Sequence, residues 1–259
     1  MDFLKVVKRR TVFSELTYIV LNLGLVIAIL SVVIVTGSLI PGILLVLMSK
    51  WRILAVRPRY WIANITVNTV DIIVSVSYVV LLFAANGYIL VQLFIAVLYT
   101  IWILILKPRS SRKYIILQAL IALFLGITAL SIISYNWPVF MVVIITWIIA
   151  YSSMKHMLDS YDETHAHFFS LLWALILAEL SWLIYHWMIA YSIPGAGDIK
   201  LPQVSIIMLA LFFVTERIYN SYSRHGSIRL GDIVLPIILS FSIILVLLLF
   251  FSEISINTL

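Results

Sequence analysis

Long apolar runs separated by short polar stretches dominate the sequence from about residue 16 onward. A run of about 20 apolar residues forms a helix long enough to span the roughly 30 Å hydrocarbon core of a bilayer. The pattern therefore predicts an all-α, polytopic membrane bundle that forms a single domain over residues 1–259. The nine expected helices cover about 16–36, 38–54, 62–84, 88–106, 114–134, 137–153, 168–190, 203–220 and 232–251.

The second expected helix, 38–54, has the weakest pattern. Pro41 and Gly42 lie at its start, and Lys50 and Arg52 interrupt its end. Long basic side chains can extend to the membrane surface from such positions, so a spanning helix is compatible with them. A short or re-entrant element is the alternative.

Composition agrees with the pattern. Of the 259 residues, 64% are hydrophobic and 11% are charged, whereas about 25% of a typical soluble domain is charged. The predicted connections are too short to hold a soluble domain. We therefore expect a multi-pass integral protein, in a plasma membrane of the bacterial inner-membrane type.

The basic residues predict how the chain is oriented, because Lys and Arg collect on the cytoplasmic side of membrane proteins. With the N-terminus inside and nine crossings, 16 of the 17 basic residues fall in cytoplasmic segments, and Lys200 alone falls outside. We predict an N-in, C-out topology. The net charge of +6 then indicates contact with anionic lipid headgroups and not with nucleic acid. The candidate headgroup ligands are Arg57, Arg59, Arg109 and Arg112.

A weak internal repeat is compatible with the sequence. The stretches "VRPRYWI" at 56–62 and "LKPRSSRKYI" at 106–115 each place a basic-Pro-Arg element before an outward-going helix. They would begin two tandem helix pairs, 56–106 and 106–153. Pro and Arg are also common at cytoplasmic helix starts, which is the alternative explanation.

A polar stripe runs along the third expected helix. Asn64, Asn68, Asp71, Ser75 and Tyr78 are spaced by alternating steps of four and three, so they share one helical face. A carboxyl group that faced lipid would cost several kcal/mol. The stripe is therefore expected to face other helices or a wet cavity.

The seventh expected helix carries a second carboxyl group, Glu179, on the same face as Trp182 and His186. At 1.5 Å per residue, Asp71 and Glu179 lie roughly 14 and 17 Å from the cytoplasmic boundary. If the two helices are neighbours, these carboxyl groups could share a proton or a cation. The alternative is a structural role, in which each acid is protonated or hydrogen-bonded and holds neighbouring helices together.

The cytoplasmic loop "KHMLDSYDETHAHF" at 155–168 concentrates potential metal ligands. His, Asp and Glu are all ligands for zinc and similar divalent ions, although the spacing here matches no metal motif. An alternative is that these acids pair with the basic loops around them. The candidate ligands are His156, Asp162, Glu163, His165 and His167.

Three functions fit these features. The leading hypothesis is a transporter or channel-like permease with an acidic proton or cation site at Asp71 and Glu179, lined by Asn64, Asn68, Ser75 and His186. A scaffold or assembly subunit that binds other membrane subunits, or copies of itself, is the second. The third is a membrane-embedded enzyme that acts on lipid at the cytoplasmic face. No motif of nucleotide-binding proteins, zinc proteases or serine hydrolases occurs in the sequence.

Overall fold

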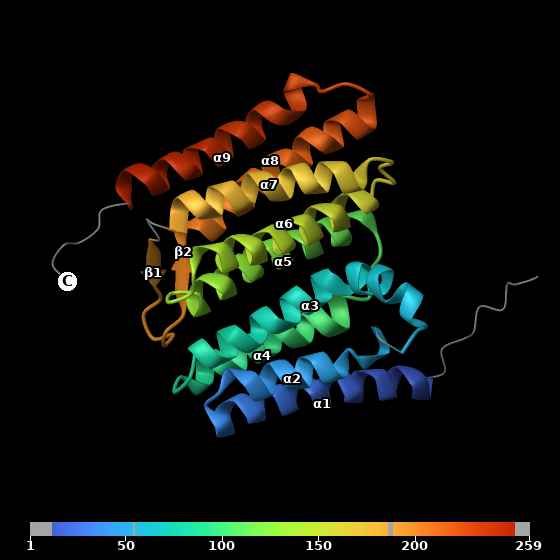
Figure 1. Cartoon of the computed structure of the whole chain (residues 1–259), viewed down its shortest axis with the longest axis vertical. Coiled ribbons are helices and arrows are strands. Elements are labelled where there is room, and N and C mark those ends of the chain that lie inside the picture. Colours follow the sequence, from blue (N-terminus) through green and yellow to red (C-terminus); the bar gives the residue numbers. More distant parts are fainter. Residues whose placement is uncertain (1–11, 54, 186–188, 252–259) are drawn as a thin grey trace, which may run out of the picture.

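The computed structural model describes residues 12–53, 55–185 and 189–251. The helices lie side by side along the longest axis of the molecule, from α1 at one end to α9 at the other, with α4 on the α1 side of α3 (Figure 1). Within these ranges, eight helices are long and apolar enough to cross a membrane, and a ninth is shorter. The long helices are α1 (Val12–Thr36), α3 (Trp61–Ala84), α4 (Ile89–Ile101, extended to Leu106 by a π-helical turn), α5 (Arg112–Ile133), α6 (Val139–Asp159), α7 (Ala166–Tyr185), α8 (Gln203–His225) and α9 (Leu230–Phe250).

These helices confirm the predicted all-α membrane bundle. The second segment is indeed short, because α2 covers only Leu39–Ser49. Two 3₁₀ turns, Trp51–Ile53 and Pro58–Tyr60, follow it before α3 begins. The start of α1 and the end of α9 lie at opposite ends of the bundle (Figure 1), as an odd number of crossings requires.

Two hydrophobic cores stabilise the bundle, one formed mainly by α1–α4 and the other by α5–α8. They meet where α3 packs against α5 and α6. Gly126 of α5 permits this close approach: a Cβ atom there would lie 2.9 Å from Cγ2 of Ile73 and 3.0 Å from Cγ2 of Ile149. A side chain at this position would therefore separate α5 from the helices on both sides of it.

A two-stranded antiparallel hairpin covers the end of the bundle that we predict to be outside. Its strands are β1 (Ala190–Ser192) and β2 (Lys200–Pro202). The backbone N–H of Asp198 donates a hydrogen bond to the carbonyl of Ala84, 2.8 Å away. This bond attaches the hairpin to the last residue of α3.

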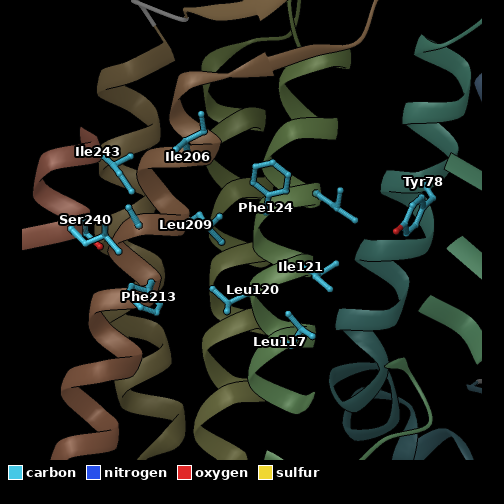
Figure 2. Close-up of a pocket in the computed structure, with 13 residues that line it drawn as sticks. Tyr78, Leu117, Leu120, Ile121, Phe124, Ile206, Leu209, Phe213, Ser240 and Ile243 are labelled. Carbon is cyan, nitrogen blue, oxygen red and sulfur yellow. The ribbon is translucent and has the colours of Figure 1, made fainter. Parts of the chain in front are cut away.

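An apolar groove lies within the bundle between α3 and α5 on one side and α8 and α9 on the other (Figure 2). It encloses about 570 Å³. Aliphatic and aromatic side chains line almost all of it, including Phe124 of α5 and Leu209 of α8. A second cavity, of about 730 Å³, lies at the basic end of α5 and α8.

Candidate functional site

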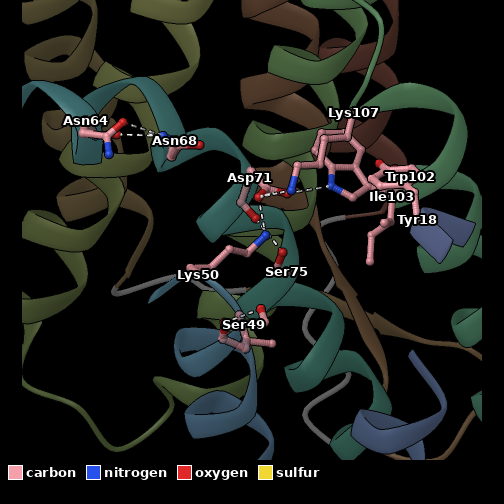
Figure 3. A network of polar contacts seen from close by, with 11 residues as sticks. Tyr18, Ser49, Lys50, Asn64, Asn68, Asp71, Ser75, Trp102, Ile103 and Lys107 are labelled. Atoms are coloured by element: carbon pink, nitrogen blue, oxygen red, sulfur yellow. Dashed lines mark hydrogen bonds and ion pairs between the residues drawn. The ribbon is translucent and has the colours of Figure 1, made fainter. Parts of the chain in front are cut away.

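Asp71 lies at the centre of a cluster of charges, here called the charged centre, that consists of the largely buried Lys50 and Asp71 and the more exposed Lys107 (Figure 3). Both lysine ammonium groups form ion pairs with the same carboxylate oxygen, Oδ2 of Asp71, and the distance to Nζ of Lys107 is 2.8 Å. The other oxygen, Oδ1, accepts a hydrogen bond of 3.3 Å from the indole nitrogen of Trp102. Two cations thus share one anion.

The position of Lys50 follows from the shortness of α2. Eleven residues of α-helix extend about 16 Å, roughly half of the hydrocarbon thickness. Lys50 comes directly after the last residue of α2, so it follows a helix that is too short to cross the hydrocarbon core by itself. Its side chain is 11% exposed and that of Asp71 is 10% exposed. The ion pair is therefore largely removed from solvent.

Lys107 reaches Asp71 through an irregular end of α4. Residues Trp102–Leu106 form a π-helical turn, in which the N–H of Lys107 donates to the carbonyl of Trp102 over 2.8 Å. Such turns are frequently found at functional sites. This turn holds the fully buried indole of Trp102 and the ammonium group of Lys107 against the same carboxylate.

The rest of the predicted polar stripe supports the charged centre. Nδ2 of Asn64 donates to the carbonyl of Ile53 at 2.7 Å, and Nδ2 of Asn68 donates to the carbonyl of Asn64 at 2.8 Å. The first bond fastens the irregular segment after α2 to the first half of α3, and the second lies within α3. The Ser75 hydroxyl donates to the carbonyl of Asp71 at 2.6 Å. The stripe therefore faces protein, as its spacing predicts.

Glu179 does not belong to this site, which corrects the expectation of a shared pair of carboxyl groups. It is exposed on the outer surface of α7, beside Leu175, Ile176 and Trp182. Helix α7 packs chiefly on α6, whereas Asp71 faces Lys50 and Lys107. Among the described residues, Glu179 has no hydrogen-bond or ion-pair partner. The two carboxyl groups lie at comparable depth in helices that do not meet.

The predicted centre also differs in charge from the observed one. A pair of acids would have favoured a proton or a cation, but Asp71 is outnumbered by two lysines. Sequence spacing could not indicate this, because the lysines lie 21 and 36 positions away from Asp71. His186, the remaining candidate of the stripe on α7, lies outside the described residues.

The predicted metal site in the loop after α6 is not formed. No group of three His, Cys, Asp or Glu side chains that could hold a metal ion occurs in the described part of the chain. His156 lies 2.9 Å from Oε1 of Gln118, and Nδ1 of His167 lies 2.8 Å from the Tyr151 hydroxyl. Asp162 and His165 are exposed. The five candidates thus point to different neighbours, because they flank a sharp turn between two helices.

Glu163 of this loop has a structural role. Its Oε2 accepts a hydrogen bond from the Tyr219 hydroxyl of α8, and its Oε1 accepts one of 2.9 Å from the N–H of His165. These two bonds, the one from Tyr219 first, lower the pKa of Glu163 below its ordinary value. Nearby, burial raises the pKa of Tyr161, whose hydroxyl donates to Oε1 of Glu216 at 3.0 Å. The loop is thereby fastened to α8.

The four predicted headgroup ligands lie at the basic end of the bundle, but in different settings. Arg57 and Arg59 are exposed, and the Arg109 guanidinium lies over the Tyr114 ring at 4.4 Å. Only Arg112 lines a cavity, which it shares with basic residues of α8 that the sequence did not single out. These residues are Arg217 and Arg224, which lie seven positions apart and therefore on one face of α8. This spacing was the signal by which the sequence could have identified them.

Comparison of the chain with protein-family models, with curated proteins and with solved structures finds no match. The functional argument therefore rests on the geometry described above.

Proposed function

We propose that this integral membrane protein is a permease for a small anionic solute, in a bacterial plasma membrane, and that the charged centre binds the solute. One observation carries the proposal: Asp71, within the span-length helix α3, meets two lysines where the half-length helix α2 ends. Ionisable residues within membrane-spanning helices are expensive and usually functional. Interrupted helices that end at the binding site are a recurrent feature of transporters.

The balance of charge supports an anion. Lys50 and Lys107 together carry one positive charge more than Asp71 neutralises. The Lys107 side chain is 39% exposed, whereas that of Lys50 is 11% exposed. An entering anion can therefore replace Asp71 as the partner of Lys107, while the deeper ion pair between Lys50 and Asp71 keeps the site assembled.

Flux through reconstituted protein tests the proposal. Purified chain in proteoliposomes is given gradients of chloride, acetate and phosphate, and internal pH is recorded in parallel. We expect saturable flux of at least one anion, and we expect Lys107→Gln to reduce it strongly because the exposed cation of the centre is lost. If the wild-type chain carries none of these anions and no protons, the permease proposal is wrong.

The control variants separate function from folding. Replacing both members of the deeper pair, Lys50→Met with Asp71→Leu, removes the two buried charges of the centre together and leaves only Lys107, whose side chain is 39% exposed. This double variant is expected to fold and to lose flux. The matched control, Lys155→Met with Asp159→Leu, removes an ion pair of 2.6 Å near the end of α6. Equal flux losses in both double variants would contradict a specific role for the centre.

A second candidate function, assembly with another membrane-spanning chain, is favoured by Glu179. This acid is exposed among apolar side chains near the middle of α7 and has no partner in the described part of the chain. A carboxyl group at such depth costs several kcal/mol if lipid surrounds it. A neighbouring span that supplies a hydrogen-bond donor would remove this cost.

Cysteine cross-linking tests the assembly function directly, since the chain has no native cysteine. We expect Cys at Ile176 and at Leu183, which are exposed on the same face as Glu179, to cross-link to a companion chain in native membranes. Cys at Leu177, which is fully buried, is the matched control. Cross-links that persist unchanged with Glu179→Leu would show that the acid does not hold the companion.

A further inference from the structure

The cavity at the basic end of the bundle has the composition of an anion-binding site. It lies between the start of α5, the turn after α6 and the second half of α8. Four basic side chains and one acidic side chain line it: Arg112, Lys113, Arg217, Arg224 and Glu216. The acid is already neutralised, because Tyr161 donates to its Oε1 and Nε of Arg217 lies 3.4 Å from its Oε2.

Several donors in this cavity are free to bind a ligand. Lys113 and Arg224 have no hydrogen-bond or ion-pair partner among the described residues. Arg112 uses its Nε to donate to the carbonyl of Ser160 at 3.1 Å, and its guanidinium lies over the Tyr161 ring at 4.5 Å. These contacts fix the orientation of Arg112 and leave its terminal nitrogens available. Guanidinium groups held in this way suit phosphate oxygens.

The apolar groove of Figure 2 adjoins this cavity. Leu120 of α5 and Phe213 of α8 line both, so the two spaces share a boundary. Arg217 lies over the Phe213 ring at 5.0 Å and marks the transition from basic to apolar lining. From there the groove continues along α5, α8 and α9 past Leu209 and Ile243. Its lining offers chiefly hydrocarbon surface.

We propose that the cavity and the groove together form a binding site for an anionic phospholipid of the inner leaflet. The phosphate lies among Arg112, Lys113 and Arg224, and an acyl chain occupies the groove between α5 and α8. A basic pocket between helices at the cytoplasmic side is a known form of lipid recognition. The site is separate from the charged centre, so this inference does not depend on the permease proposal.

The combination of linings distinguishes a lipid from other anions. A soluble phosphate would use the basic cavity and gain nothing from the adjoining apolar groove. A zwitterionic lipid would place a quaternary ammonium group near basic side chains, where no unpaired acid is available in the described lining. An anionic lipid satisfies both parts of the site.

Native mass spectrometry of the full chain, released from nanodiscs of equimolar phosphatidylcholine and phosphatidylglycerol, tests the proposal. We expect the wild-type chain to retain phosphatidylglycerol preferentially. The variant Lys113→Gln with Arg224→Gln should weaken this retention by roughly 30-fold, since each basic residue near the surface contributes to binding. Neither side chain has a described hydrogen-bond partner to lose, so the fold should be preserved.

Three further arms test the groove, the effect of net charge and the kind of anion. Leu209→Trp fills the groove and should reduce the retention of phosphatidylglycerol although every basic residue is present. The exposed pair Arg52→Gln with Arg229→Gln, which lies outside the lining of the cavity, is the matched control for net charge and should retain the lipid as the wild type does. Millimolar inorganic phosphate should not displace the lipid.

Three results would overturn the proposal. The first is equal retention of both lipids by the wild-type chain. The second is an equal loss in the Arg52/Arg229 control, which would indicate unspecific attraction to the membrane surface. The third is displacement of the lipid by inorganic phosphate, which would assign the cavity to a soluble anion.

Discussion

At the scale of single residues, the polar side chains of the bundle connect segments that the chain itself does not join. Asp71 of α3 holds Lys50 after α2 and Lys107 after α4. Glu163 of the turn before α7 holds Tyr219 of α8. Each acid therefore fixes the position of an irregular segment, where no helical hydrogen-bond pattern could do so.

The contact between Glu163 and Tyr219 predicts a pH dependence. The folded-state pKa of Glu163 lies below its ordinary value of 4.5. The stability that this carboxylate contributes is therefore present above about pH 4.5 and is lost as the pH falls through the lowered folded-state pKa. Tyr219→Phe should raise the pKa of Glu163 toward its ordinary value, as followed by carbon NMR of the labelled carboxyl group in micelles.

The control for this titration is Tyr222→Phe, which removes a neighbouring hydroxyl from the same helix. Tyr222 is 51% exposed, and we expect its loss to leave the pKa of Glu163 unchanged. A titration of Glu163 that does not respond to Tyr219→Phe would show that the hydrogen bond contributes nothing to the pKa.

At the scale of elements, two helices depart from the regular spanning pattern, and both departures serve the charged centre. The termination of α2 after 11 residues brings Lys50 to Asp71, and the π-helical turn at the end of α4 brings Trp102 and Lys107 there. The irregularities are therefore part of the site.

The close packing of α5 predicts that replacing one glycine has a large effect on the stability of the fold. Gly126→Val should destabilise the fold by about 1–3 kcal/mol, because the new side chain overlaps Ile73 and Ile149. Gly24→Val on α1 is the matched control, since nothing lies within 4 Å of its Cβ position. Thermal unfolding in detergent, followed by circular dichroism, measures both. Similar melting temperatures for the two variants would refute the close approach of α5 to α3 and α6.

At the scale of the whole molecule, the helices form a row, and the start of α1 and the end of α9 lie on opposite sides of this row (Figure 1). The basic residues concentrate at the helix ends on one side of this row, where the cavity beside Arg112 and Arg224 also lies. The same asymmetry that orients a membrane protein thus gathers on one surface the residues that we propose as ligands for an anionic headgroup.

Topology is testable with single cysteines in this chain without native cysteine. With an N-in orientation, Cys at Thr36 and Asn136 should react with an impermeant maleimide added outside intact cells. Cys at Arg59 and Ser227 should react only after permeabilisation. Labelling of Thr36 and Arg59 from the same side would show that residues 38–60 do not cross the membrane.

The sequence by itself determined the class of protein, the positions of the helices and the polar face of α3. The physical reason is that each of these depends on local properties: the length of an apolar run, or the spacing of polar residues by three and four. The weakness of the pattern in segment 38–54 likewise indicated the short helix α2. The asymmetry of the basic residues predicted an orientation in the same way.

Only the tertiary structure decided which ionisable groups meet. Asp71 and Glu179 have similar depths, but α3 and α7 are not packed together, and Glu179 faces outward. The partners of Asp71 come instead from the ends of α2 and α4. Which side chains face one another depends on the rotation and neighbours of each helix, and these are set by packing between distant segments that the spacing along one helix does not encode.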